Sequence, residues 1–305
     1  MDVRLVNVEV AVTDPAGKFV PGLQPHNFRL REDGVPQTIA HFAPTRAPVR
    51  VVLLVEASPA VFLIRREHLV AAHQLLRALR PEDEVTLISY AHVPHHEVPF
   101  TRDKQLVEKR LDLLGRFGLG MAEMNLLDAV AETLAWLSPP PRRTAVVVIG
   151  TGLDSGSATR WDELRQRVGA GQLTFFTLAT GRLLRAEPEG KKKDRAQADL
   201  WAGFEDEFAR ADSRLEALAE TSAGQAYFPE SAKELDRIYA EIAERLRNLY
   251  SLGYYPTNAA RDGAYRGIRV ELVDDASAPL AAHDPKGQPV PYRLFARPGY
   301  FAPRD

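Results

Sequence analysis

The sequence predicts an α/β protein, with a doubly wound, mostly parallel sheet in the middle of the chain and a β-sandwich formed by its two ends. The middle contains short, continuously apolar runs that alternate with helical patterns, as in parallel sheets that are covered on both faces. Residues 1–46 instead alternate apolar with polar side chains, which is the pattern of strands with one buried face. Residues 251–305 show the same alternation, so we expect the two ends to pair with each other.

The composition limits the classes of function. The chain has 305 residues, of which 45% are hydrophobic and 26% charged, enough for one large or two modest domains. A formal net charge of -2 argues against nucleic acid as a partner. The absence of cysteine excludes disulfides, thiolate metal sites and cysteine nucleophiles. Neither a transmembrane segment nor a signal peptide is expected, because no apolar run approaches roughly 20 residues and the opening MDVRLVNVEV lacks the signal pattern.

The two ends carry the sandwich strands. Valine recurs at every second position of VNVEVAV, residues 6–12, which predicts a strand. Asp33-Gly34 predicts a hairpin turn, because glycine tolerates the positive φ that a tight turn needs. Strands are expected again in YRGIRVELVDD and YRLFARPGYF, and we expect the aromatic side chains of GYYPTN and RPGYF at the seam with the α/β part. The expected division is 1–46 and 251–305 for the sandwich and 47–250 for the α/β domain.

Continuously apolar strands define the central sheet. Residues 51–55, VVLLV, have no polar side and predict a central strand. A helix is expected at 62–79 and another at 125–137, where SPPP ends it because proline lacks an amide proton. HEVPF, residues 96–100, predicts a short hairpin at the sheet edge. The other expected elements are strands at 84–91, 144–150 and 173–180 and helices near 103–117 and 161–169.

Residues 182–212 interrupt this alternation. They are charged and poor in β-branched side chains, so we expect an exposed insertion with a helix near 201–210 and with Lys191–Lys193 at a loop tip. A second helix and a short strand are expected in 214–228. The next helix, capped near Ser231, is amphipathic. Its buried stripe is expected to comprise Leu235, Ile238, Ile242 and Leu246.

The order of elements and three phrases carry a resemblance to a known family. These are the opening VNVEVAVTDPAGKFVPGLQPHNFRLREDGVPQTIAHF, the SLGYYPTNAARDGAYRGIRVEL after the last helix, and the closing FARPGYFAP. The middle of the chain resembles a von Willebrand factor type A domain, and the whole chain resembles a bacterial family in which that domain interrupts a small β-sandwich. The resemblance implies protein binding and adhesion, at the cell envelope or after secretion.

The resemblance also implies a metal-ion-dependent adhesion site, which this chain retains only in part. The family pattern is Asp-x-Ser-x-Ser, a threonine in a second loop and an aspartate in a third. Its positions fall on Glu56, Ser58, Ala60, Met124 and Thr151. One carboxylate remains and a sulfur replaces an oxygen, which is a poor match to Mg²⁺. We therefore expect no metal and no cofactor.

We accordingly predict a non-catalytic interaction module that binds a protein partner without a metal. The expected partner-binding residues are Glu56, Ser58, Asn125, Thr151 and Asp154. The alternative is a metal-dependent adhesion protein in which Glu123, Asn125 and Asp154 supply substitute oxygens. Asp154 is also suited to capping the helix region that follows it.

A second alternative from another class is a hydrolase that uses His92, His95 and His96. Three histidines within five residues also suit zinc. However, neighbours on a strand point to opposite faces, which favours an exposed hairpin. His68 and His73 are five residues apart, which is not a same-face helical spacing, so we expect both to be surface or partly buried helix residues. No phosphate loop or nucleophile elbow is present.

Overall fold

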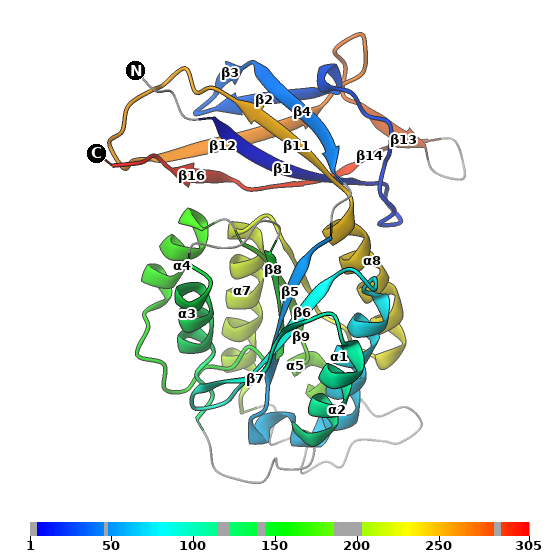
Figure 1. The fold of residues 1–305 in the computed structure, drawn as a ribbon, viewed down its shortest axis with the longest axis vertical. Helices are drawn as coiled ribbons and strands as arrows, with labels where there is room; N and C mark the ends of the chain where they lie inside the picture. The colour runs from blue at the N-terminus through cyan, green and yellow to red at the C-terminus, as the bar shows by residue number, and fades with distance from the viewer. Residues whose placement is uncertain are drawn as a thin grey trace.

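The computed structural model describes residues 5–45, 48–114, 123–138, 144–171, 173–185, 203–283 and 288–304. The middle of the chain forms one six-stranded sheet with helices on both faces (Figure 1). The two ends form two four-stranded antiparallel sheets that lie together at one end of the α/β part (Figure 1). The predicted fold class is therefore confirmed.

The six-stranded sheet has the strand order β10-β9-β8-β5-β6-β7. All neighbours are parallel except β7, which pairs antiparallel with β6 and closes one edge of the sheet, as the HEVPF pattern predicts. The parallel strands end at a common edge, where open α/β sheets bind ligands. The strands are β5 (Arg50–Glu56), β6 (Glu84–Tyr90), β7 (Pro94–Thr101), β8 (Thr144–Gly150), β9 (Thr174–Ala179) and β10 (Gln225–Tyr227).

Strand β5 explains why the sheet needs helices on both faces. Its residues Val51–Val55 are at most 1% exposed. Val51, Leu53 and Val55 pack into one apolar cluster, and Val52 and Leu54 pack into the other. The first cluster is covered by α1 (Arg65–Ala78), α2 (Lys104–Leu114) and α8 (Leu235–Arg247), and the second by α3 (Leu126–Trp136), α4 (Trp161–Ala170) and α7 (Glu205–Thr221). A short helix, α5 (Gly181–Arg185), follows β9, and a 3-10 turn, η2 (Pro59–Ile64), precedes α1.

The two chain ends pair as predicted. β1 (Val6–Thr13) is hydrogen-bonded to β11 (Leu249–Tyr254) and to β15 (Arg293–Ala296), and β4 (Ile39–Thr45) completes that sheet. Asp33 and Gly34 form the predicted turn with φ of +48° and +82°. The second sheet contains β2 (Phe28–Glu32), β3 (Val35–Gln37), β12 (Tyr265–Leu272) and β16 (Gly299–Phe301), and a separate hairpin contains β13 (Ala281–His283) and β14 (Pro289–Pro291). Between the sheets, Val8, Val10 and Val12 are fully buried.

Part of the predicted insertion belongs to the core. We predict two separate helices, one near 201–210 and one within 214–228, but α7 is one continuous helix over Glu205–Thr221. Phe208 and Ala211 are 1% exposed, so this stretch is packed rather than looped, and no glycine or proline interrupts it. Lys191–Lys193 lie outside the described residues. The stripe predicted for α8 is confirmed, and Ser231 forms a capping box with Glu234 at the 3-10 turn η3 (Ala232–Glu234) before it.

The aromatic residues near the last strands do not all lie at the seam. Tyr254 is fully buried in the core of the sandwich. Its hydroxyl donates to the Glu32 carboxylate at 2.5 Å, and the hydroxyl of Tyr300 donates to the same oxygen at 2.9 Å. Tyr255 and Phe301 are exposed. The seam prediction is wrong for Tyr254, because the buried carboxylate inside the sandwich requires hydroxyl donors.

Candidate functional site

The loops at the carboxyl ends of β5 and β6 and the start of α3 are tied together by backbone hydrogen bonds. The amide of Ala57 donates to the carbonyl of Tyr90 at 2.7 Å. The amide of Asn125 donates to the carbonyl of Ala91 at 2.8 Å. These bonds hold the loop after β5, the loop after β6 and the start of α3 side by side. The five predicted site residues all lie at this end of the sheet: Glu56, Ser58, Asn125, Thr151 and Asp154.

The Glu56 carboxylate is the centre of a closed hydrogen-bond cluster. Its side chain is 2% exposed. One oxygen accepts a hydrogen bond from the Ser58 hydroxyl, and the other accepts from the amide and the hydroxyl of Thr151 at 2.5 and 2.8 Å. Burial raises the pKa of Glu56 above its ordinary value of 4.5, although these three donors act in the opposite direction. Both oxygens of this carboxylate thus accept hydrogen bonds from donors of the protein itself.

His68 belongs to the same cluster, and its prediction as a surface or partly buried residue is wrong. It is 2% exposed, and its Nε2 lies 2.9 Å from the backbone oxygen of Glu56. A carbonyl oxygen only accepts, so Nε2 carries the proton and Nδ1 accepts from the Thr180 hydroxyl at 3.3 Å. Burial lowers the pKa of His68 to about 4. The helical periodicity of the sequence could have predicted this burial. Positions 68, 72, 75 and 76 lie on one face of the helix and form a buried stripe.

Tyr90 and Gly150 complete the floor of the cluster. Tyr90 is 1% exposed, and its hydroxyl has no hydrogen-bond partner within the described part of the chain. Burial, with the negative charge of Glu56, raises its pKa well above the ordinary value. A Cβ atom at Gly150 would lie 2.4 Å from the Tyr90 hydroxyl and 2.8 Å from Glu56 Oε2. Only glycine therefore fits at position 150 without displacing these two side chains.

Asp154 caps a helix, but not the one that follows it in sequence. Its carboxylate accepts from the amide of Leu127 at 3.2 Å, at the start of α3, and from the Ser157 hydroxyl at 2.5 Å. Asp128 of α3 accepts in turn from the amides of Ala158 and Thr159 at 2.9 and 2.8 Å. These reciprocal bonds fix the loop after β8 against α3.

The three histidines of the hydrolase alternative have different neighbours. His92 Nδ1 lies 3.0 Å from Oε2 of Glu123. His95 is paired with Ser89 in the β6–β7 register, and the ring of His96 packs edge-on against Trp136 at 4.6 Å. Their side chains therefore do not converge on one ion or one substrate atom.

The site residues fit poorly to the Mg²⁺ site that the family resemblance implies. The side chain of Glu56, one methylene longer than the aspartate of the family pattern, reaches the amide and the hydroxyl of Thr151 directly. The oxygens of Glu56, Ser58 and Thr151 are hydrogen-bonded to one another, so an ion would have to break these bonds as well as shed water. In the described ranges, no three or more His, Asp or Glu side chains are grouped so as to hold a metal ion.

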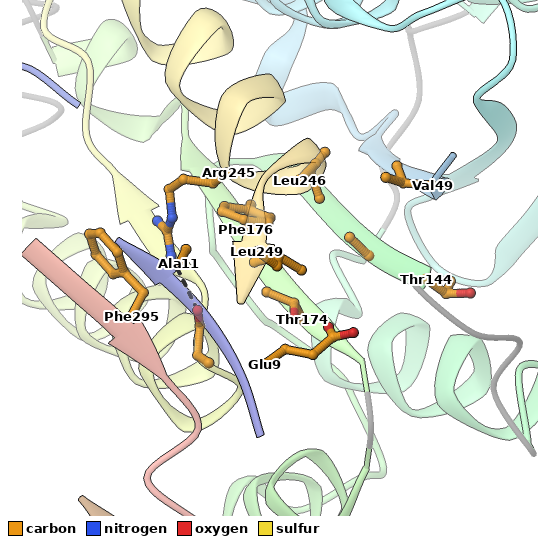
Figure 2. Close-up of a pocket in the computed structure, with 12 residues that line it drawn as sticks. Glu9, Ala11, Val49, Thr144, Thr174, Phe176, Arg245, Leu246, Leu249 and Phe295 are labelled. Carbon is orange, nitrogen blue, oxygen red and sulfur yellow. Dashed lines mark hydrogen bonds between the residues drawn. The ribbon is translucent and has the colours of Figure 1, made fainter. Parts of the chain in front are cut away.

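A cavity of about 40 Å³ lies at the opposite end of the sheet, at the seam with the sandwich (Figure 2). Arg245 lines it and is 2% exposed, with its guanidinium 3.5 Å from the ring centre of Phe295 and 4.9 Å from that of Phe176. The same side chain donates to Gln225 at 2.8 Å and to the backbone of Ala223 at 3.1 Å. The space suits a few water molecules, and we interpret it as packing around a structural arginine.

None of the described helices combines the length and the apolar character needed to cross a bilayer.

No family model and no curated protein matches the sequence. Solved structures do match the fold. A von Willebrand factor type A protein from Catenulispora acidiphila is 8% identical, with a TM-score of 0.47, over 97% of this chain and 74% of that one.

Two further matches cover the α/β part. BatB from Bacteroides thetaiotaomicron is 15% identical, with a TM-score of 0.42, over 65% of this chain and 98% of its own. The von Willebrand factor domain of the pilus tip protein Mfa5 from Porphyromonas gingivalis is 13% identical, with a TM-score of 0.41, over 66% of this chain and 95% of its own. The likeness concerns the fold. By its own strand order and helix layers, the chain has a mostly parallel six-stranded α/β sheet joined to a β-sandwich.

Proposed function

We propose that the chain is a non-catalytic protein-interaction module that binds its partner at the carboxyl ends of the parallel strands, without a metal ion in the Glu56 pocket. Von Willebrand factor type A-like domains commonly bind proteins. The observation that supports the metal-free reading is the enclosure of the Glu56 carboxylate by Ser58 and Thr151. In this proposal residues 47–250 carry the binding face, and residues 1–46 and 251–305 form the sandwich that supports it.

The five predicted residues have two roles in this proposal. Glu56, Ser58 and Thr151 are at most 2% exposed, so they hold the loops in place rather than touch a partner. Asn125 and Asp154 fix the start of α3 to its neighbouring loops. The contact surface is made by exposed side chains of the same loops: His92, Val93, Glu123, Ser155 and Ala158.

Charged substitutions on this face test the docking surface. A partner is first identified by photo-crosslinking from position 158 in an extract of the organism of origin, and its affinity is then measured with the purified protein. We expect Val93→Arg and Ala158→Arg to weaken binding at least tenfold, because a buried unpaired charge is costly at an interface. Ala276→Arg, in an exposed turn of the sandwich, is the matched control. Equal affinity in all three variants contradicts the proposed face.

Calorimetry tests the metal-free part of the proposal. We expect no Mg²⁺ or Mn²⁺ binding that depends on Ser58. Clear binding that Ser58→Ala abolishes contradicts the proposal and supports the metal-dependent adhesion alternative. A panel of ester, peptide and phosphate substrates tests the absence of catalysis. Turnover that is lost in His95→Ala supports the hydrolase alternative instead.

A further inference from the structure

Three side chains form a cluster at the rim of the candidate binding face, in the loop after β6 and the loop before α3. His92 Nδ1 lies 3.0 Å from Oε2 of Glu123. Asn125 lies beside His92, with its Nδ2 at 2.9 Å from the backbone oxygen and 3.4 Å from Nδ1 of that histidine. We propose that His92, Glu123 and Asn125 bind a divalent first-row transition metal ion, with Zn²⁺ as the probe.

The buried amide oxygen of Asn125 points to a missing ligand. Asn125 is 4% exposed. Because the carbonyl of His92 only accepts hydrogen bonds, the Nδ2 atom must face it and Oδ1 must face away. Among the described residues Oδ1 has no hydrogen-bond partner. A buried acceptor without a partner destabilises the fold, and a bound cation supplies the missing partner.

The amide oxygen and the carboxylate converge on one point. A Cβ atom built at Gly156 would lie 2.8 Å from Glu123 Oε2 and 3.1 Å from Asn125 Oδ1. Both atoms are acceptors, and the Nδ2 donor of Asn125 faces the backbone oxygen of His92 instead. A cation in place of the proton shared by His92 and Glu123 is attracted by both oxygens. Gly156 leaves this space open because it has no side chain.

The spacing and the donor types suit a transition metal. Two ligands bound to one ion at about 2.0–2.1 Å, with an angle between a right angle and tetrahedral, are roughly 2.9–3.4 Å apart. The 3.0 Å between His92 Nδ1 and Glu123 Oε2 falls in this range. An imidazole ligand favours Zn²⁺ or Ni²⁺ over Mg²⁺. The side chains of His92 and Glu123 are 65% and 58% exposed, so an ion reaches them without unfolding, and water completes its coordination.

This site is distinct from the Glu56 pocket and does not depend on the proposed partner binding. It has only two of the usual metal-binding side chains, with an amide oxygen as the third ligand. We therefore expect weaker binding than at a four-ligand structural zinc site. The absence of metal binding here leaves the docking face defined by Val93 and Ala158 unaffected.

Calorimetric titration of the full chain with ZnCl₂, in a buffer without chelators, tests the site. We expect one ion per chain. His92→Ala and Glu123→Gln are each expected to weaken binding tenfold or more, as the loss of a ligand does. His95→Ala is the matched control, because His95 is an exposed histidine three residues away that lies outside the cluster, and its affinity is expected to stay at the wild-type value.

Nuclear magnetic resonance of the histidine side chains gives a second readout. The imidazole nitrogen signals of His92 are expected to shift on addition of Zn²⁺ and to stay in place with Mg²⁺. No Zn²⁺ binding by the wild-type chain overturns the proposal. So does binding that His92→Ala leaves intact, or that His95→Ala weakens equally. Far-ultraviolet circular dichroism of each variant shows whether a loss of binding comes from a loss of fold.

Discussion

Thr151 donates two hydrogen bonds to a single carboxylate oxygen of Glu56, at 2.5 Å from its amide and 2.8 Å from its hydroxyl. Thr151 follows β8, Glu56 ends β5, and these two strands are neighbours in the sheet. This contact links the end of β5 to the loop after β8 through side-chain and backbone hydrogen bonds. The candidate face is therefore held in place by the protein's own donors.

The buried Glu56 carboxyl gives stability a definite pH dependence. Its pKa in the folded chain is raised above 4.5 by burial, so the folded state holds this proton to higher pH than the unfolded state. The favourable contribution is complete below about pH 4.5 and is lost as pH rises through the folded pKa. We expect wild type to lose stability relative to Glu56→Gln over this rise, as measured by guanidinium unfolding at several pH values. A stability difference that changes with pH in the opposite direction contradicts the burial argument.

His68 gives the reverse dependence. Its pKa is lowered from 6.5 to about 4, so the unfolded state binds the proton first, and stability is lost as pH falls from 6.5 towards 4. The lowering corresponds to roughly 3 kcal/mol. We expect this loss in wild type and not in His68→Gln, measured by urea unfolding. His95→Gln, at an exposed position, is expected to keep the wild-type profile. A stability difference between wild type and His68→Gln that does not change between pH 6.5 and 4 rules out a buried neutral His68.

Gly150→Ala tests the close packing of Tyr90 against Glu56. The new methyl group would lie 2.4 Å from the Tyr90 hydroxyl, and Tyr90 is too deeply buried to move aside. Overpacking of this kind costs about 1–3 kcal/mol, and displacing a buried hydrogen bond adds to it. Thermal unfolding measures the loss. Gly267→Ala is the control, because its nearest atom lies at an ordinary 3.5 Å; an equal effect of both substitutions would falsify the steric account.

Arg245 joins the sandwich to the α/β sheet through Phe295 of β15 and Phe176 of β9. We expect Arg245→Met to lower the free energy of unfolding by about 1–3 kcal/mol, because two buried hydrogen bonds and the cation–π contacts are lost together. Arg237→Met on the same helix is the control, since the Arg237 side chain is 66% exposed. A double-mutant cycle with Phe295→Ala measures the coupling across the seam. Additive effects show that the ring contact contributes nothing.

Local patterns were sufficient for most of the secondary structure. The apolar run at residues 51–55, the valine alternation of β1 and the turn at Asp33-Gly34 each predict their elements, because burial and backbone freedom act over a few residues. The prediction was wrong in part at α7. Charge density suggested an exposed insertion with a separate helix near 201–210, although Phe208 and Ala211 are buried in one continuous helix. Charge describes the solvent side of a helix and says little about its buried side.

The candidate site depended on contacts between residues far apart in the chain. The residue types around Glu56 show that acidic metal ligands are scarce. They do not show that Thr151, 95 positions away, donates a hydrogen bond to the Glu56 carboxylate. Nor do they show that His68 lies under the same loop or that Asp154 caps α3. Parallel strands bring these distant residues to one edge only after the sheet has formed. Side-chain partners, burial and pKa shifts therefore arise from the tertiary structure. The periodicity of each helix and strand is already present in the sequence.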